Sequence, residues 1–203
     1  MEFVAIDVET ANADVASICQ VGLAHYRDGR LIEEWKTYVD PQDHFMGVNI
    51  SIHGIDAAMV KGGPTLPEVA DTICRFLDDR VSLAHTGFDR ASIRQAFEKY
   101  ALRHPRCTWL DSAKVVRRTW VEFSRRGYGL GNVCSHLGYT YGAHDALEDA
   151  KAAAHVFHAA VERTGLDVEA WLERVTQPIG AAHGAPRARR GRGPRSTGPW
   201  TDR

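Results

Sequence analysis

Short apolar runs near the start of the chain predict strands. Residues 3–6 are a short apolar run, typical of a buried strand, and residues 18–26 and 31–39 are predicted as two further strands. The dipeptide Asp28-Gly29 separates the second run from the third, and glycine tolerates the positive φ that a tight hairpin turn needs. We therefore predict that the first three strands form an antiparallel meander.

After Pro41 the apolar spacing becomes helical. Thr65 followed by Glu68 is the signature of a capping box, and apolar residues at helical spacing come directly after it. The predicted elements that follow are a strand at 81–84, a helix around 93–100, a strand at 108–110, and helices at 112–119, 130–137, 145–163 and 168–175. Hairpin strands followed by alternating strands and helices predict an α/β fold, with a mixed sheet flanked by helices.

Charge and composition divide the chain in two. Residues 1–177 have the composition of one domain, whereas residues 178–203 are rich in Gly, Pro, Ala and Arg. This C-terminal segment carries six arginines and one aspartate, a net charge of +5, so the remainder of the chain carries −6. We expect a domain at 1–177 and a disordered tail at 178–203.

Two observations indicate a cytoplasmic protein. No apolar run approaches the roughly 20 residues that a membrane helix needs, and the first residues lack the basic stretch of a secretory signal. The four cysteines are far apart in the sequence, with no C-x-x-C pair. We expect reduced thiols, no zinc site and no membrane partner.

The first predicted strand ends in two carboxylates. Asp7 and Glu9 are two residues apart, which places both side chains on one face of a strand. Adjacent carboxylates repel each other, and hard divalent cations such as Mg²⁺ prefer carboxylate oxygens. The alternative is a solvated strand end with two surface acids, since this motif is weak by itself.

A second acidic cluster opens the longest predicted helix. Asp145 and Glu148 are spaced as a capping pair, which places the helix start at Asp145 and makes both residues caps rather than ligands. His144 then lies on the preceding loop and Asp149 in the first turn, so the two can converge. Alternatively, Asp149 is a first-turn acid that the helix dipole favours. Asp89 follows a short polar loop and, taken alone, is expected to be a helix N-cap.

Together, these segments resemble the three motifs of the DnaQ-like 3′-to-5′ exonucleases, in the subgroup with a catalytic histidine. The segments Ile52-His53-Gly54-Ile55, Leu110-Asp111-Ser112 and Tyr128-Gly129-Leu130 also resemble that family, over roughly residues 1–164. One departure is the second motif, which in the family reads His-Asn-Ala-x-Phe-Asp and here is one residue shorter, without the Asn. The five functional positions that match are Asp7, Glu9, Asp89, His144 and Asp149.

The resemblance implies a ribonuclease H-like sheet and a two-metal phosphodiester hydrolase. It implies two Mg²⁺ ions, with Mn²⁺ as a substitute, held by the four carboxylates, and it implies that His144 is the general base. Thr10, His53 and Phe88 are expected to contact the terminal nucleotide; for Phe88 the alternative is a core position, and for His53 a loop histidine with satisfied ring nitrogens.

The expected partners are single-stranded nucleic acid 3′ ends, with DNA favoured over RNA. The protein is either a free-standing nuclease or a subunit whose further partner is a DNA polymerase. Two alternatives remain: an exoribonuclease that trims RNA, and a non-catalytic module that binds nucleic acid or docks on a polymerase. The Arg-rich tail either adds affinity for phosphate or is a solvated extension.

Overall fold

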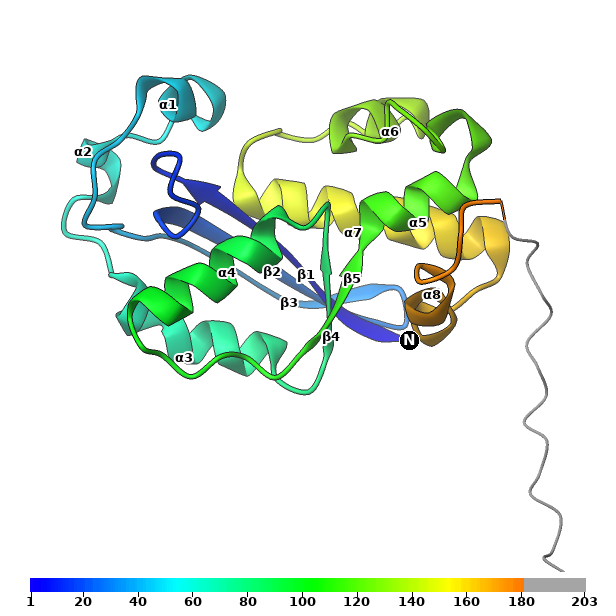
Figure 1. Cartoon of the computed structure of the whole chain (residues 1–203), viewed down its shortest axis with the longest axis horizontal. Coiled ribbons are helices and arrows are strands. Elements are labelled where there is room, and N and C mark those ends of the chain that lie inside the picture. Colours follow the sequence, from blue (N-terminus) through cyan, green and yellow to red (C-terminus); the bar gives the residue numbers. More distant parts are fainter. Residues whose placement is uncertain (181–203) are drawn as a thin grey trace, which may run out of the picture.

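The computed structural model describes residues 1–180 as a five-stranded mixed sheet between two layers of helices (Figure 1). The strand order is β3-β2-β1-β4-β5. β1 pairs antiparallel with β2, and β2 with β3, whereas β4 runs parallel to both β1 and β5. The strands are β1 (Glu2–Thr10), β2 (Ile18–Arg27), β3 (Arg30–Tyr38), β4 (Val81–Ala84) and β5 (Thr108–Asp111). The predicted fold class is confirmed.

The described helices include every one predicted from the sequence. These are α3 (Leu66–Leu77), α4 (Phe88–Lys99), α5 (Ser112–Thr119), α6 (Leu130–His136), α7 (Ala146–Thr164) and α8 (Val168–Arg174). The capping box of α3 is confirmed, because the Glu68 carboxylate accepts a 2.7 Å hydrogen bond from the Thr65 amide. The structure adds two short helices and a 3-10 turn that the sequence did not predict: α1 (Gly47–His53), α2 (Ala57–Val60) and η1 (Val121–Phe123).

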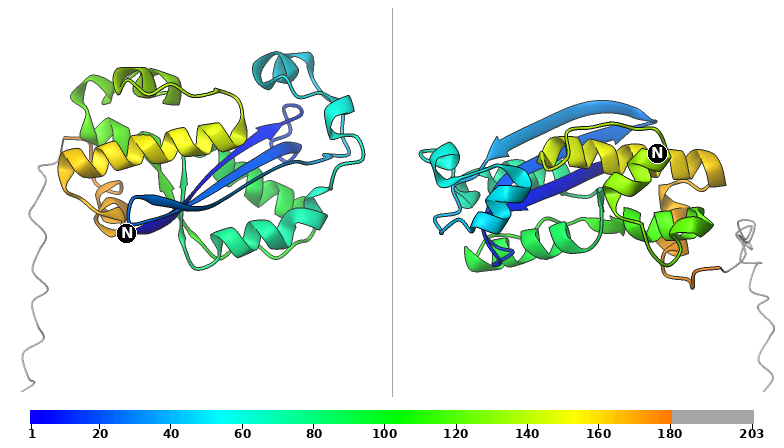
Figure 2. Two further views of the ribbon diagram at one scale, coloured as in Figure 1. Left: turned by 180° about the vertical axis from the view of Figure 1, so that it is seen from behind. Right: turned by 90° about the horizontal axis from the view of Figure 1, so that it is seen from above.

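Two apolar cores lie on opposite faces of the sheet. α7 packs across β1 and β2 on one face, with α5 and α6 beside it, and α3 and α4 cover the other face (Figure 2). Phe3 and Phe157 meet edge to face at 5.2 Å in the first core, and Ile73 and Phe97 are fully buried in the second. Burying both faces fixes which side chains of β1 point toward α7.

The turn between β2 and β3 is the predicted hairpin. Asp28 has a φ of 50° and Gly29 a φ of 77°, so both central residues adopt the left-handed conformation of a type I′ turn. All four cysteines are free thiols, as expected. No helix within residues 1–180 combines the length and apolar character that crossing a bilayer requires. The predicted disordered tail lies outside the described residues, except for its first three positions.

Candidate active site

The carboxyl ends of the parallel strands meet at one edge of the sheet, where the candidate site lies. β1 runs past the end of β4 and carries Asp7 and Glu9 beyond it, directly opposite Gly22 and Gln20 of β2. Residues that face each other across an antiparallel pair point to the same face of the sheet. Asp7 and Glu9 therefore share the face against which α7 packs, as their spacing predicts.

α7 begins over these two carboxylates because β2 leaves room for its backbone. The Gln20 side-chain oxygen, which is buried, accepts a 2.8 Å hydrogen bond from the amide of Ala146. A Cβ atom on Gly22 would lie 2.3 Å from the carbonyl carbon of Ala146, so only glycine permits this approach. Sequence reasoning missed both residues, because their roles depend on a contact across more than 120 positions of the chain.

His144 and Asp149 are brought together at the start of α7. The His144 amide donates a 2.6 Å hydrogen bond to Oδ2 of Asp149, and His144 has a φ of 66° on the loop before the helix. Asp145 is the N-cap, since its carboxylate accepts from the amides of Leu147 and Glu148, and Lys36 lies 2.7 Å from its second oxygen. The prediction that Asp145 is a cap is confirmed, whereas Glu148 pairs with Lys151 instead of closing a capping box.

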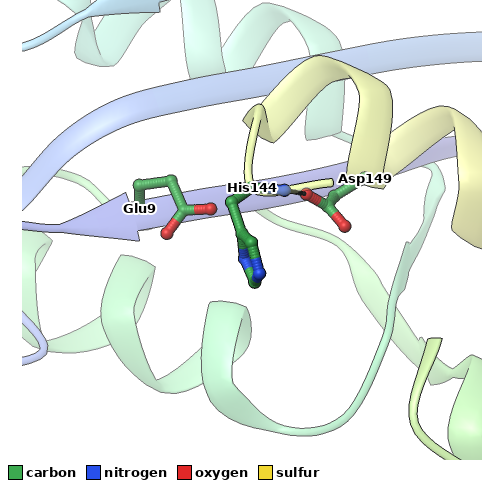
Figure 3. A group of neighbouring side chains, drawn as sticks. All are labelled: Glu9, His144 and Asp149. Carbon is green, nitrogen blue, oxygen red and sulfur yellow. Dashed lines mark hydrogen bonds between the residues drawn. The ribbon is translucent and has the colours of Figure 1, made fainter. Parts of the chain in front are cut away.

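Three potential ligands converge at this point. One carboxylate oxygen of Glu9, one ring nitrogen of His144 and one carboxylate oxygen of Asp149 all lie within 4.8 Å of one another. Figure 3 shows Glu9 on β1 and Asp149 on the first turn of α7, with the His144 ring projecting from the loop between them. Two carboxylates and an imidazole at this separation can surround a metal ion.

Asp89 reaches the same region from the other side of β1. Its Oδ1 atom accepts a 3.0 Å hydrogen bond from the amide of Val8, between the two carboxylates of β1, and the side chain is 2 % exposed. The expectation that Asp89 caps its helix is wrong, because α4 begins at Phe88 after the N-cap Gly87. The local pattern of an acid at a helix start did not reveal that the helix turns this side chain inward onto β1.

The cluster of carboxylates is electrostatically unfavourable by itself. Burial, followed by the repulsion of neighbouring carboxylates, raises the pKa of Asp7 well above its usual value and that of Glu9 to about 8. Burial raises the pKa of Asp89 to about 7, although the Val8 amide opposes this shift. Burial also raises the pKa of Asp149, against the lowering effect of the His144 amide.

The donor set fits a divalent cation. None of these four carboxylates forms an ion pair with a lysine or arginine within residues 1–180. Burial and mutual repulsion, which raise the pKa values of these carboxyl groups, are opposed by no such cation, and a hard cation with carboxylate ligands would supply that positive charge. The arrangement can therefore bind divalent metal and, through it, the phosphates of a substrate.

The predicted substrate contacts border the cluster. Thr10 is buried at the end of β1, and its carbonyl accepts hydrogen bonds from the ring of His53 at 3.1 Å and from Asn49 at 2.8 Å. His53 Nδ1 accepts from the amide of Ile55, so Nε2 carries the proton that is donated to Thr10. Both ring nitrogens of His53 therefore have hydrogen-bond partners within the protein, as expected for a loop histidine with a structural role. Sequence analysis missed Asn49, since α1 lacks a helical apolar pattern.

Phe88 is not a core residue. Its side chain is 42 % exposed at the first position of α4, so its ring is available to a ligand beside the site. The shortened loop before it is held by Thr86, whose amide donates to Asp111 at 3.2 Å and whose φ is 82°. A β-branched residue in the left-handed region is strained, and such strain is typical of functional loops.

Comparisons with known proteins identify the family of the chain. The exonuclease family model RNase_T matches residues 4–157. The chain is 30% identical over 160 residues to DNA polymerase III subunit epsilon of Aquifex aeolicus, covering 76% of this chain and 78% of the relative. It is 27% identical over 192 residues to a Mycobacterium tuberculosis protein named for a bifunctional exonuclease and endonuclease. That match covers 86% of this chain and 30% of the relative. The chain spans 11% to 30% of the length of the first curated relatives it matches.

Solved structures share the fold. Exonuclease X in complex with 5′ overhanging duplex DNA superposes with a TM-score of 0.67 at 20% identity, covering 85% of this chain and 99% of that one. The nuclease domain of 3′hExo, a DEDDh family member bound to rAMP, gives a TM-score of 0.65 at 17% identity. The match covers 79% of this chain and 92% of that one. The family model and the epsilon relative together show that the chain belongs to the RNase_T exonuclease family, in agreement with the motif resemblance.

Proposed function

We propose that this protein is a metal-dependent 3′-to-5′ exonuclease that removes nucleoside monophosphates from single-stranded nucleic acid ends, with DNA favoured over RNA. The observation that carries the proposal is the convergence of Glu9, His144 and Asp149 within 4.8 Å, in a family of exonucleases. Asp7 and Asp89 add two further carboxylates at the same strand end.

The four carboxylates would hold the metal. Asp7, Glu9, Asp89 and Asp149 are proposed as the ligands of two Mg²⁺ ions, for which Mn²⁺ would substitute. Bound ions of this kind lower the pKa of a water molecule and neutralise charge that develops on the phosphate. Their positive charge would also return the carboxylates to the ionised form that the metal-free cluster disfavours.

His144 is proposed as the general base. Its ring is exposed, and within residues 1–180 no hydrogen bond restrains either ring nitrogen. The ring would take a proton from the attacking water as the water oxygen bonds to phosphorus and the bond to the leaving 3′ oxygen breaks. An imidazole suits this role because it titrates near neutral pH.

The terminal nucleotide would lie between β1 and α4. The exposed ring of Phe88 would stack on the last base, since every base presents a π face. Thr10 and His53 would contact the sugar beside Glu9. Because both nitrogens of the His53 ring are engaged, its contact would be made by the ring face and would depend on the bond to Thr10.

The similarity to an epsilon subunit supports a role as a polymerase subunit that acts on DNA ends in the cytoplasm, where four free thiols are stable. A structural neighbour bound to rAMP keeps RNA trimming as the second candidate. A module that only binds nucleic acid is disfavoured, because unneutralised carboxylates repel phosphate.

The test is cleavage of 5′-labelled DNA and RNA oligonucleotides of the same sequence, with and without Mg²⁺. We expect a ladder that shortens from the 3′ end only with metal and is lost in Asp7→Ala, faster on DNA than on RNA. Equal binding of both oligonucleotides without cleavage, with Mg²⁺ or Mn²⁺, would contradict the proposal and favour the binding module. Faster cleavage of RNA would favour the exoribonuclease.

A further inference from the structure

A basic surface stands out on an otherwise acidic protein. Residues 112–130 hold five lysines and arginines and a single acid, Glu122, whereas residues 1–180 as a whole carry a net charge of −6. Glu122 lies 3.3 Å from the ring of His136 and forms no ion pair with a lysine or arginine within residues 1–180. We call this the α5 basic surface, and its members are Lys114, Arg117, Arg118, Arg125 and Arg126.

The arginines of this surface differ from those in the first half of the chain. Six of the eight arginines before residue 112 form ion pairs with carboxylates: Arg27, Arg75, Arg80, Arg94, Arg103 and Arg106. None of the five members of the α5 basic surface pairs with a carboxylate within residues 1–180. Arg117 and Arg118 donate hydrogen bonds to backbone carbonyls, and Lys114, Arg125 and Arg126 are exposed. Clustered like charges repel one another, so the surface fits a polyanionic partner.

The surface is joined to the loop that precedes Asp89. Arg117 lies over the ring of Tyr128, with its guanidinium carbon 4.8 Å from the ring centre. The carbonyl of Tyr128 accepts a 2.9 Å hydrogen bond from His85, and His85 also contacts the hydroxyl of Ser112 at 2.8 Å. His85 is four residues before Asp89, so these contacts connect Arg117 to the loop that leads into the candidate site.

We propose that the α5 basic surface binds the phosphates of the substrate strand on the 5′ side of the nucleotide being removed. This inference rests on the proposed function and adds the substrate class: a strand of several nucleotides rather than a dinucleotide. Arg117 is held against the ring of Tyr128, whereas Arg125 and Arg126 are exposed and are the proposed phosphate contacts. The partner is a nucleic acid backbone, because its closely spaced phosphates would neutralise five cations that have no carboxylate partner within residues 1–180.

The test compares two substrates of different length with the double variant Arg125→Ala/Arg126→Ala. One substrate is a 20-nucleotide single strand, and the other is the p-nitrophenyl ester of thymidine 5′-monophosphate, which fills only the terminal position. The matched control is Arg30→Ala/Arg163→Ala, which removes two exposed arginines from the β2–β3 turn and the far end of α7. Neither arginine forms an ion pair in the described part of the chain, residues 1–180.

We expect the double variant to raise the KM for the 20-mer about tenfold with little change in kcat, and to reduce the slope of log KM against log salt by about 1.4. Hydrolysis of the small ester should be unchanged, and the control should leave both substrates unaffected. An unchanged KM and an unchanged salt slope for the 20-mer would overturn the inference. That result would favour an acidic protein as the partner of the α5 basic surface.

Failure of the proposed function has a different outcome: the wild-type protein then hydrolyses neither substrate with Mg²⁺ or Mn²⁺. In that case the anisotropy of a labelled 20-mer still decides the inference. Weaker binding and a smaller salt slope in Arg125→Ala/Arg126→Ala than in the control would support it, and equal binding by the two variants would overturn it.

Discussion

Gly22 on β2 and Ala146 at the start of α7 touch backbone to backbone, and a Cβ at position 22 would lie 2.3 Å from the Ala146 carbonyl carbon. This contact sets the height of the first turn of α7 above the sheet. Because His144 and Asp149 flank that turn, the same contact places them over Glu9. The geometry of the site therefore depends on Gly22, which has no side chain that could take part in a reaction.

The first prediction concerns this contact. Gly22→Ala should push α7 away from β2 and lower the free energy of unfolding by about 3 kcal/mol. The added methyl group would clash with backbone atoms of α7, which cannot rotate away as a flexible side chain can. Gly47→Ala adds the same group in open space and is the control. Thermal unfolding of both variants, with Mg²⁺ titrations, checks the prediction; equal stability of the two would show that α7 is not held in this way.

The raised pKa values predict that metal binding releases protons. At pH 7 Glu9, with a pKa of about 8, is mostly protonated, and Asp89, with a pKa of about 7, is half protonated. Mg²⁺ must displace these protons, so about one or more should be released per chain at pH 7, and the number should fall as the pH rises through the pKa of Glu9. Calorimetric titrations in buffers of different ionisation enthalpy measure this number. Release that stays constant from pH 6 to 9 would argue against protonated carboxylates in the metal-free site.

Replacing His144 separates a general base from a metal ligand. His144→Ala should lower kcat by about 10²–10⁴ while the affinity for Mg²⁺ stays close to that of the wild type. Asp149→Asn is the comparison, because it should weaken metal binding itself. Since the His144 ring lies within 4.8 Å of two carboxylates, a loss of metal affinity in His144→Ala would instead identify the ring as a ligand.

The loop before Asp89 stores strain at Thr86. Its φ of 82° suits glycine, whereas both threonine and alanine are strained there. Thr86→Gly should therefore be more stable than Thr86→Ala by about 1 kcal/mol. Denaturant unfolding of the two variants measures the difference. Equal stability would indicate that the bond from the Thr86 amide to Asp111 does not impose this conformation.

Much of the fold was predictable because local patterns and tertiary packing agree. The strands β2 and β3, the Asp28-Gly29 turn between them and the capping box of α3 were all readable in the sequence. α1 was not predicted, because none of its residues is buried and its sequence is rich in β-branched residues. Its helical form follows from contacts such as the bond of Asn49 to the Thr10 carbonyl.

In the site, too, some features follow from local sequence and others depend on tertiary contacts. The spacing of Asp7 and Glu9, and the Asp145 cap that places His144 before α7, could be derived from strand and helix geometry. Asp89 could not, because its contact with the Val8 amide depends on how α4 packs against β1. The family resemblance identified Asp89 where local reasoning assigned a cap, since motif order reflects the assembled site rather than the local conformation.

The most direct measurement is the electron paramagnetic resonance spectrum of Mn²⁺ bound to the wild-type protein and to Asp7→Asn. If Asp7, Glu9, Asp89 and Asp149 hold two ions about 4 Å apart, the wild type should bind two Mn²⁺ per chain and give a spin-coupled spectrum. Asp7→Asn should lose the coupling. A wild-type chain that binds no Mn²⁺, or one uncoupled ion that Asp7→Asn does not change, would contradict the assignment of these carboxylates to a two-metal nuclease site.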